Sequence, residues 1–388
     1  MSYGKISDTK AAVFLSGTDR LTSPPPTVTV HQGEFNHEVL EFEYRPTTMV
    51  NKSFVSGSLI SVVYGLNGPG LSRLFVGYVN HTEPLYIDGE KGQHRIRVMC
   101  IGPTFQMKGS NQGVYTNQPL DVIIKKIANT YRLNTSVTPT SYSWASTAQQ
   151  GQSDWLFLCK LARQAGYNLI PNGTTIKANP RNLSALRSRI GNNFSVLTLA
   201  DIGDGSLMEF YPLVGSESPG GGTRATRQAA GVDARTGQPI YSMKTPPTAG
   251  LALTAPPPLF VSNTVDTPVR NLSEANAALV GQDGDNKMYQ EAKLRGWGDV
   301  NFRPGGLVYI NGTSTNTNGF WYIKDVRHEV TTGTHPLYTV YATICRDSVG
   351  KSPSVPLPQI RPTTTPSGYD LTPPSTIVGG AWVSAYAA

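Results

Sequence analysis

The stretch that decides the fold is Gln152-Ser153-Asp154-Trp155-Leu156-Phe157-Leu158-Cys159-Lys160-Leu161-Ala162, followed after three residues by Gly166-Tyr167. Ser153 is a favourable N-cap, and Asp154 stands in the first turn, where the helix dipole favours an anion. The apolar residues recur three and four positions apart, and Gly166 stands where a C′ glycine ends a helix. The pattern predicts an α-helix that begins after Ser153 and ends before Gly166.

A second helix and a hairpin flank this one. Pro119 is tolerated in a first helical turn, and it precedes apolar residues at helical spacing: Leu120, Ile123, Ile124, Ile127, Ala128 and Tyr131. On the other side, two strand-like runs surround Asn172-Gly173, which favours a tight hairpin turn. We therefore predict an α+β insertion domain over residues 109–192.

The chain on either side alternates apolar and polar residues in short runs, a pattern typical of strands. In the first part these runs include Leu59–Tyr64, Phe75–Val79 and Ile96–Ile101; in the second, Val196–Leu199, Leu207–Val214, Leu307–Ile310, Phe320–His328 and Leu337–Ile344. The predicted fold is mainly β with α+β insertions. Two related small β-barrel domains, residues 1–108 and 193–348, are joined by the α+β domain.

The second predicted barrel carries two insertions. Residues 215–268 are rich in Gly, Pro, Thr and Ser and predict a long loop. Residues 273–292 predict a helical insertion with Ser273 as its N-cap, divided where Gly281 and Gly284 interrupt the pattern. Residues 349–388 form a predicted Pro-rich C-terminal extension that ends in small apolar residues, and we expect it to dock onto a neighbouring chain.

Composition supports the β reading and excludes several classes. Charged residues make up only 15% of the chain, with 39 Gly and 29 Pro, which favours turns and strands. The net charge of +7 is scattered, and the densest groups, Arg181–Arg189 and Arg224–Arg227, lack interleaved aromatics. We expect these groups to be solvated surface. No apolar run is long enough to span a membrane and no secretion signal is present, so we expect synthesis in a cytoplasm.

Motifs for chemistry are missing from the sequence. The six histidines show no metal-ligand spacing, no Gly-x-Ser-x-Gly occurs, and the three cysteines lie too far apart for a Cys-x-x-Cys site. We therefore expect no catalytic residue, no metal and no cofactor, free core thiols, and a structural role for His328. Two alternatives stay open: a tail-associated peptidoglycan hydrolase using carboxylates such as Glu83, Glu209 or Glu291, and a carbohydrate- or receptor-binding module using the loop 311–318.

Three stretches resemble the phage tail baseplate hub, or late-control protein, family, which is related to the shaft portion of type VI secretion spike proteins. The first is Phe75–Val79. The second is Gln118–Ile123 followed by the Ser153 helix start and Gly166-Tyr167. The third contains Gly296, Phe302–Gly305, Val308, Gly312, Gly319–Ile323 and Val326–His328. The motif and interface candidates are Phe75, Gly77, Val79, Ser153, Asp154, Trp155, Gly166, Tyr167, Arg303, Pro304, Gly305, Phe320, Tyr322 and His328.

This resemblance implies a structural hub and not an enzyme. It implies a homotrimer whose six barrels form a pseudo-hexameric ring between a hexameric tail tube, or distal tail proteins, and a trimeric spike or tail tip. The expected location is the baseplate of a bacteriophage virion assembled in the host cytoplasm, with genome DNA passing through the lumen during ejection. A tape-measure protein is a further candidate partner. We expect the strands around Phe75–Val79 and Phe320–Ile323 to lie near subunit contacts.

Overall fold

The computed structural model describes residues 10–15, 19–20, 25–44, 54–65, 72–85, 95–140, 143–181, 186, 194–199, 206–213, 226–233, 235–244, 262–264, 269–288, 290–314, 317–332 and 337–346. Strands predominate, and the mainly β fold class is confirmed. In the described part of the chain, no helix is both long and apolar enough to cross a membrane. The predicted extension 349–388 lies outside the described residues.

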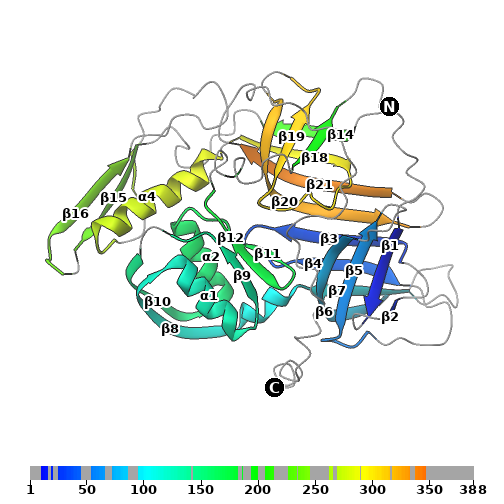
Figure 1. Cartoon of the computed structure of the whole chain (residues 1–388), viewed down its shortest axis with the longest axis horizontal. Helices are drawn as coiled ribbons and strands as arrows, with labels where there is room; N and C mark the ends of the chain where they lie inside the picture. Colours follow the sequence, from blue (N-terminus) through cyan, green and yellow to red (C-terminus); the bar gives the residue numbers. More distant parts are fainter. Residues whose placement is uncertain are drawn as a thin grey trace.

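Two β units lie side by side (Figure 1). The first contains β1 (Lys10–Leu15), β2 (Asp19–Arg20), β3 (Thr27–Gly33), β4 (Val39–Tyr44), β5 (Leu59–Gly65), β6 (Ser72–Leu85) and β7 (Arg95–Ile101). The second contains β13 (Ser195–Thr198), β14 (Leu207–Leu213), β18 (Gln290–Trp297), β19 (Leu307–Asn311), β20 (Gly319–Thr331) and β21 (Leu337–Arg346). Along strands such as β4 and β18, buried residues alternate with more exposed ones, so one face of the sheet covers the core.

The two β units share one sheet. Its hydrogen-bonded order is β14-β18-β21-β20-β3-β4-β7-β6-β5-β1-β2, and β19 and β13 branch from β20. The first half of β20 pairs with β19, and after an irregularity at Lys324 the second half pairs with β3. Both units contribute to a single hydrophobic cluster, which contains Phe42 and Phe75 as well as Trp321 and Ile344. The units are therefore joined directly, through strand pairing and a continuous core.

In Figure 1 the α+β unit lies beside the first β unit and below the second. It contains η2 (Pro103–Lys108), β8 (Ser110–Pro119), α1 (Leu120–Thr130), β9 (Asn134–Val137), β10 (Ser143–Ser153), α2 (Asp154–Gln164), β11 (Ile170–Asn172) and β12 (Thr175–Ala178). Both predicted helices and the Asn172-Gly173 hairpin are confirmed. Pro119 is the N-cap residue of α1 and stands one position before the predicted place. The unit has its own core, built around Leu158 and Ile124.

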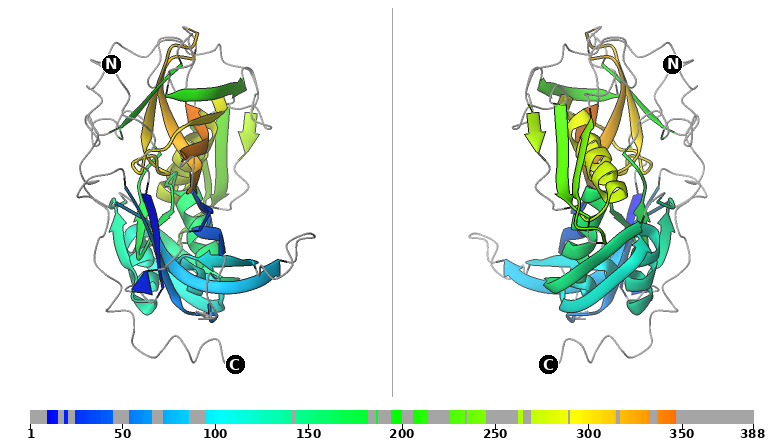
Figure 2. Two further views of the ribbon diagram at one scale, coloured as in Figure 1. Left: turned by 90° about the vertical axis from the view of Figure 1, so that its right-hand side faces the viewer. Right: turned by 90° about the vertical axis from the view of Figure 1, so that its left-hand side faces the viewer.

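A fourth part, here called the arm, projects from the body (Figure 1) and faces the viewer in the right-hand view of Figure 2. It contains β15 (Thr226–Val232), β16 (Pro239–Lys244), β17 (Ser262–Thr264) and α4 (Leu272–Lys287), and its small core includes Ala229, Ile240 and Leu279. The prediction of one long loop over 215–268 is wrong, because the β15–β16 hairpin and β17 occupy much of it. The remaining residues of that loop lie outside the described ranges.

The predicted helical insertion over 273–292 is partly wrong. Helix α4 runs without interruption past Gly281 and Gly284, because an interior glycine costs only about 1 kcal/mol and the arm core holds the helix. Its N-cap is Asn271, whose side chain accepts from the Glu274 amide, and not Ser273. Ala292 belongs to β18, where alternate residues are buried.

Candidate functional site: a buried polar joint

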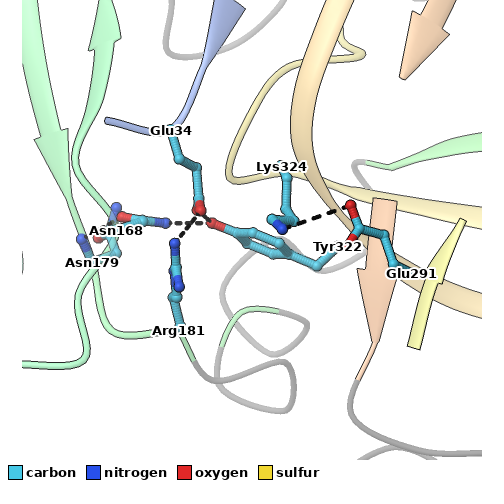
Figure 3. A network of polar contacts seen from close by, with 7 residues as sticks. All are labelled: Glu34, Asn168, Asn179, Arg181, Glu291, Tyr322 and Lys324. Atoms are coloured by element: carbon cyan, nitrogen blue, oxygen red, sulfur yellow. Dashed lines mark hydrogen bonds and ion pairs between the residues drawn. The ribbon is translucent and has the colours of Figure 1, made fainter. Parts of the chain in front are cut away.

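The most constrained polar site lies where the two β units and the α+β unit meet, and we call it the joint (Figure 3). It comprises Gln32, Glu34, Glu38, Asn168, Arg181, Arg303 and Tyr322. Glu34 and Glu38 come from the loop after β3, Asn168 and Arg181 from the two ends of the β11–β12 hairpin region, and Tyr322 from β20.

Glu34 is the centre of the joint. Its carboxylate accepts hydrogen bonds from the Tyr322 hydroxyl and from the Arg181 guanidinium. The same hydroxyl accepts from Asn168 Nδ2 at 2.8 Å, and Asn168 Oδ1 accepts from the backbone N–H of Asn179 at 2.8 Å. Burial raises the pKa of Glu34, while the Arg181 charge acts in the opposite direction. Burial also raises the pKa of Tyr322, so the phenol stays a neutral donor.

A second buried carboxylate, Glu38, ties the same loop to the hairpin. It accepts from Gln32 Nε2 at 2.6 Å and from the backbone N–H of Gly173 at 2.8 Å. Gln32 in turn accepts from Arg303 at 3.2 Å, which links the first and second β units. Burial raises the pKa of Glu38, and its hydrogen bonds and the Arg303 charge oppose that rise.

Phe35 completes the loop between these carboxylates. Its backbone lies in the left-handed region, with a φ of 59°, and its amide donates to the Leu169 carbonyl at 2.8 Å. Its own carbonyl accepts from Trp155 Nε1 at 3.1 Å. The guanidiniums of Arg163 and Arg181 lie 4.3 and 5.1 Å from the centre of its ring. A non-glycine residue in this conformation persists only where its surroundings hold it firmly.

Several predicted motif residues meet at or beside the joint. Trp155 and Tyr322 are hydrogen-bonded there, and Arg303 contacts Gln32. Gly305 packs against Ile170, whose Cδ1 would lie 2.4 Å from an added Cβ, and its φ of 78° also favours glycine. Pro304 is buried beside it in the same turn. The arginine-proline-glycine turn therefore positions the second β unit against the hairpin.

The cap residues of α2 stabilise the α+β unit next to the joint. Ser153 Oγ accepts from the Leu156 amide at 3.2 Å, which confirms the predicted N-cap. Asp154 is buried and accepts from the Tyr131 hydroxyl at 2.6 Å and from Gln149 at 2.7 Å. Gly166 has a φ of 70°, and the Tyr167 amide returns to the Ala162 carbonyl at 2.8 Å, a helix-ending pattern.

The remaining motif residues lie apart from the joint, inside the β cores. Phe75 and Val79 are buried in the first unit, and Phe320 packs edge-on against Phe194 and Tyr309. Because Phe75 and Phe320 are 0% and 1% exposed, their side chains contact the chain's own core. That these strands lie near subunit contacts stays a prediction.

His328 and the three cysteines are buried. His328 is fully buried on β20, with Nδ1 2.8 Å from the Tyr338 hydroxyl, and burial lowers its pKa well below the usual value. Cys100, Cys159 and Cys345 are free and buried, as expected. No cluster of three or more metal-ligating side chains occurs among the residues that the structure describes.

Sequence reasoning missed the main members of the joint. Arg181 was expected to be solvated, but it forms an ion pair with Glu34 and its side chain is only 10% exposed. Glu34 and Glu38 gave one available signal: two acids four residues apart, directly after the alternating strand β3. Asn168 and Gln32 gave none, because an isolated amide carries no periodic pattern.

A shallow groove of about 490 Å³ crosses the outer face of the shared sheet. Its lining includes His31, Asp325, Arg327 and Tyr341. The Arg327 guanidinium lies 4.1 Å from the centre of the Tyr341 ring and that of Arg295 lies 5.3 Å from it, so two charged groups contact one of the groove's two tyrosines. A sugar-stacking platform needs an open aromatic face. Tyr341 is covered by the arginines, whereas Tyr211, the second tyrosine of the groove, is 60% exposed.

The carboxylates considered for hydrolysis lie in ion pairs on the same sheet face. Glu209 pairs with Arg295 at 3.1 Å, Glu291 with Lys324 at 3.8 Å, and Glu83 with Arg97 at 3.7 Å. All three are partly exposed, and none lies in the low-dielectric pocket that keeps a general acid protonated.

Comparison with known proteins points to one group of folds. A family model described as the Alg8 N-terminal domain matches residues 43–189, less than half of the chain. No curated protein matches the sequence. The structure resembles the tail protein from Neisseria meningitidis with a TM-score of 0.64 at 11% identity, covering 88% of this chain and 98% of that one.

Two further structures extend this result. The 43 kDa tail protein of prophage MuSo2 from Shewanella oneidensis gives a TM-score of 0.60 at 14% identity, covering 87% of this chain and 98% of that one. The E. coli c3393 protein is described as a type VI secretion system component with structural similarity to T4 tail proteins gp27 and gp5. It gives a TM-score of 0.51 at 12% identity, covering 88% of this chain and 79% of that one. This chain therefore has the fold of phage tail proteins and of a type VI secretion component, which is the fold that the sequence resemblance implied.

Proposed function

We propose that this chain is a structural hub protein of a phage-type tail baseplate. Three copies form a pseudo-hexameric ring that adapts a hexameric tail tube to a trimeric spike or tail tip. The observation that carries this proposal is the fold itself: two phage tail proteins are covered over 98% of their length by this one chain. The partners are a second and third copy of the chain, tube or distal tail proteins, and a spike or tip protein.

The internal architecture supports the ring. Two β units joined by the β3–β20 pairing give each copy two bodies in a fixed orientation. Three such copies present six bodies around an axis. One face of the assembly can then match a sixfold-symmetric partner, while the assembly itself has threefold symmetry. The joint supports the same role, because buried, hydrogen-bonded polar groups hold the α+β unit against both β units.

The direct test is the mass of the full chain in solution. Size-exclusion chromatography with light scattering should give three times the 41.9 kDa chain mass, and electron microscopy should show rings with a central opening. A monomer that persists at high protein concentration contradicts the proposal.

The proposal includes the absence of catalysis. Incubation of the chain with purified cell wall should leave turbidity unchanged. Loss of turbidity that disappears in Glu209→Gln or Glu291→Gln would instead support the hydrolase. The carbohydrate-binding alternative has one observation in its favour, the exposed Tyr211 of the groove, since the groove's other tyrosine is already in contact with two arginines.

A further inference from the structure

The arm presents an apolar face that its own helix does not cover. In the β15–β16 hairpin, Gly231 pairs with Ile240, and α4 packs on the face that buries Ile240 and Ala229. The opposite face carries two cross-strand pairs, Ala230 with Tyr241 and Val232 with Pro239, and all four residues are exposed.

The exposure of this face is large for an apolar surface. Val232 is 57% and Tyr241 is 56% exposed, although both lie on regular strands. The arm also projects away from the body (Figure 1). Contiguous apolar residues on a projecting element mark an interaction surface more often than isolated exposed residues do.

A second unusual surface lies on the α+β unit. Strands β8 and β10 form a separate two-stranded ribbon, and neither strand contains a charged residue. One face of the ribbon packs on the helices through Tyr115, which stacks on Phe157 of α2. The other face carries Gln112, Val114, Thr116, Ser146, Ala148 and Gln150, and Val114 at its centre is 68% exposed.

Exposed edge strands in soluble proteins usually carry charges that prevent pairing with other chains, and this ribbon lacks them. On the β10 side, the arm already covers part of the ribbon: the Ala145 amide donates to Glu274, and Arg270 donates to the Ser146 carbonyl. Among the described strands, β8 pairs only with β10.

We propose that the apolar face of the arm in one copy docks onto the uncharged outer face of the β8–β10 ribbon in a second copy. The residues named on both faces are uncharged, and each face carries one central apolar anchor, Tyr241 on the arm and Val114 on the ribbon. The two surfaces differ, so the contact is head-to-tail, and a head-to-tail contact closes into a ring when its rotation allows. This inference rests on the proposed ring and names its subunit contact.

The test uses cross-linking between two singly substituted full-length chains. One carries Tyr241→Cys and the other Val114→Cys, and they are co-expressed, so that both enter the same oligomers before the mixture is mildly oxidised. The native cysteines are buried and free, so they contribute little background. We expect a disulfide-linked dimer on a non-reducing gel in the mixture, and in neither chain alone. Leu156→Cys, which is 61% exposed on α2, is the matched control partner for Tyr241→Cys and should give no such dimer.

Every outcome decides the inference. A dimer formed by the Tyr241→Cys chain alone indicates a symmetric arm–arm contact and overturns it. A trimer in light scattering without cross-linking in the mixture also contradicts the arm–ribbon contact, but it is consistent with the hub proposal. A monomer contradicts both the contact and the hub proposal.

A second variant tests the same contact without cysteine. Val232→Lys with Tyr241→Lys should weaken self-association more than about tenfold, because the charges would be buried against an uncharged surface. Thr236→Lys, on the exposed turn between β15 and β16, should leave association unchanged. Equal association of both variants contradicts the contact.

Discussion

Tyr322 joins three parts of the chain through a single hydroxyl. That hydroxyl donates to Glu34 and accepts from Asn168, and all three side chains are buried. Tyr322→Phe removes the hydroxyl and leaves a buried carboxylate oxygen and a buried amide each short of a partner. Groups left unsatisfied in this way cost about 1 to 3 kcal/mol each.

We therefore expect Tyr322→Phe to lower the free energy of unfolding in urea by at least about 2 kcal/mol. The matched control is Tyr309→Phe, which removes a hydroxyl from a buried tyrosine of the neighbouring strand β19. Tyr309→Phe should lower the free energy of unfolding by well under about 1 kcal/mol. Equal decreases in the two variants would show that the joint does not depend on the Tyr322 hydroxyl.

His37 gives the fold a defined response to acid. Burial lowers its pKa from 6.5 to about 4, with a smaller effect of the Lys108 charge. Its ring lies between Trp155 and Phe105, and its Nδ1 is 3.0 Å from Thr104 Oγ1. Between pH 6.5 and pH 4 the unfolded chain binds the proton more tightly, so stability falls as the pH falls through this range.

The expected contribution of His37 to this fall is roughly 3 kcal/mol from pH 7 to pH 4. His37→Phe keeps a ring against Trp155 and removes the titration. Urea unfolding at pH 7 and at pH 4.5 should show a smaller difference for the variant than for the parent chain. An unchanged difference would assign the acid response to other groups.

At the residue scale, sequence patterns located caps better than contacts. Ser153 and Gly166 were identifiable because a helix end requires particular residue types at fixed offsets. The partners of Glu34 were not identifiable, since Arg181 and Tyr322 are 147 and 288 residues away. Nor does any local pattern place Phe35 in the left-handed region.

The N-cap of helix α4 is Asn271 and not the predicted Ser273. Asn271 has an extended backbone, with φ −155° and ψ 166°, and its side chain accepts from the Glu274 amide at 2.8 Å. Ser273 is exposed inside the first turn. Asn271→Ala should destabilise the helix by about 1 kcal/mol, whereas Ser273→Ala should change it by less than half of that.

Hydrogen exchange at the amides of the first turn of α4 is the appropriate measurement, because it reports local opening of the arm. Faster exchange in Ser273→Ala than in Asn271→Ala would restore Ser273 as the cap and contradict the observed geometry.

The pairing of β6 with β7 depends on a close backbone approach. An added Cβ at Gly77 would lie 2.2 Å from the Ile101 carbonyl oxygen, a backbone atom that cannot rotate away. Gly77→Ala should therefore destabilise the chain by about 2 kcal/mol or more. Gly109 has ordinary dihedrals, φ −59° and ψ 137°, and open space around its Cα. Gly109→Ala should be neutral or slightly stabilising in the same thermal or urea unfolding experiment, and equal effects would refute the steric argument.

The elements differ in how clearly the sequence predicts them. Helices α1 and α2 have strong amphipathic patterns and were predicted within one or two residues. The hairpin β15–β16 was not, because its strands contain Gly231 and Pro239 in a stretch whose composition favours a loop. The ribbon β8–β10 was also missed, since Ser, Thr, Asn and Gln outnumber its apolar residues.

For the whole molecule, the decisive feature is the shared strand β20. Strand positions in both β units were predictable from alternation, but the partner of each strand was not. The pairing of His328 with Val30 closes a loop of almost 300 residues, which no local pattern encodes. The two barrels expected as separate domains are thus one sheet with one continuous core.

This continuity predicts that the two β units unfold together. Val98 lies on β7 in the first unit, fully buried in the cluster that also contains Val340 of β21 in the second unit. Val98→Ala should lower the free energy of unfolding by about 1 to 3 kcal/mol.

Because the core is shared, this loss of stability should appear equally in both β units. Hydrogen exchange followed by mass spectrometry should show matching increases in peptides from β4 and from β21 near the unfolding midpoint. The control is Val55→Ala, at a 59% exposed position before β5, which should leave the exchange of both peptides unchanged. An increase confined to β4 would mean that the β3–β20 pairing joins two independently folding domains.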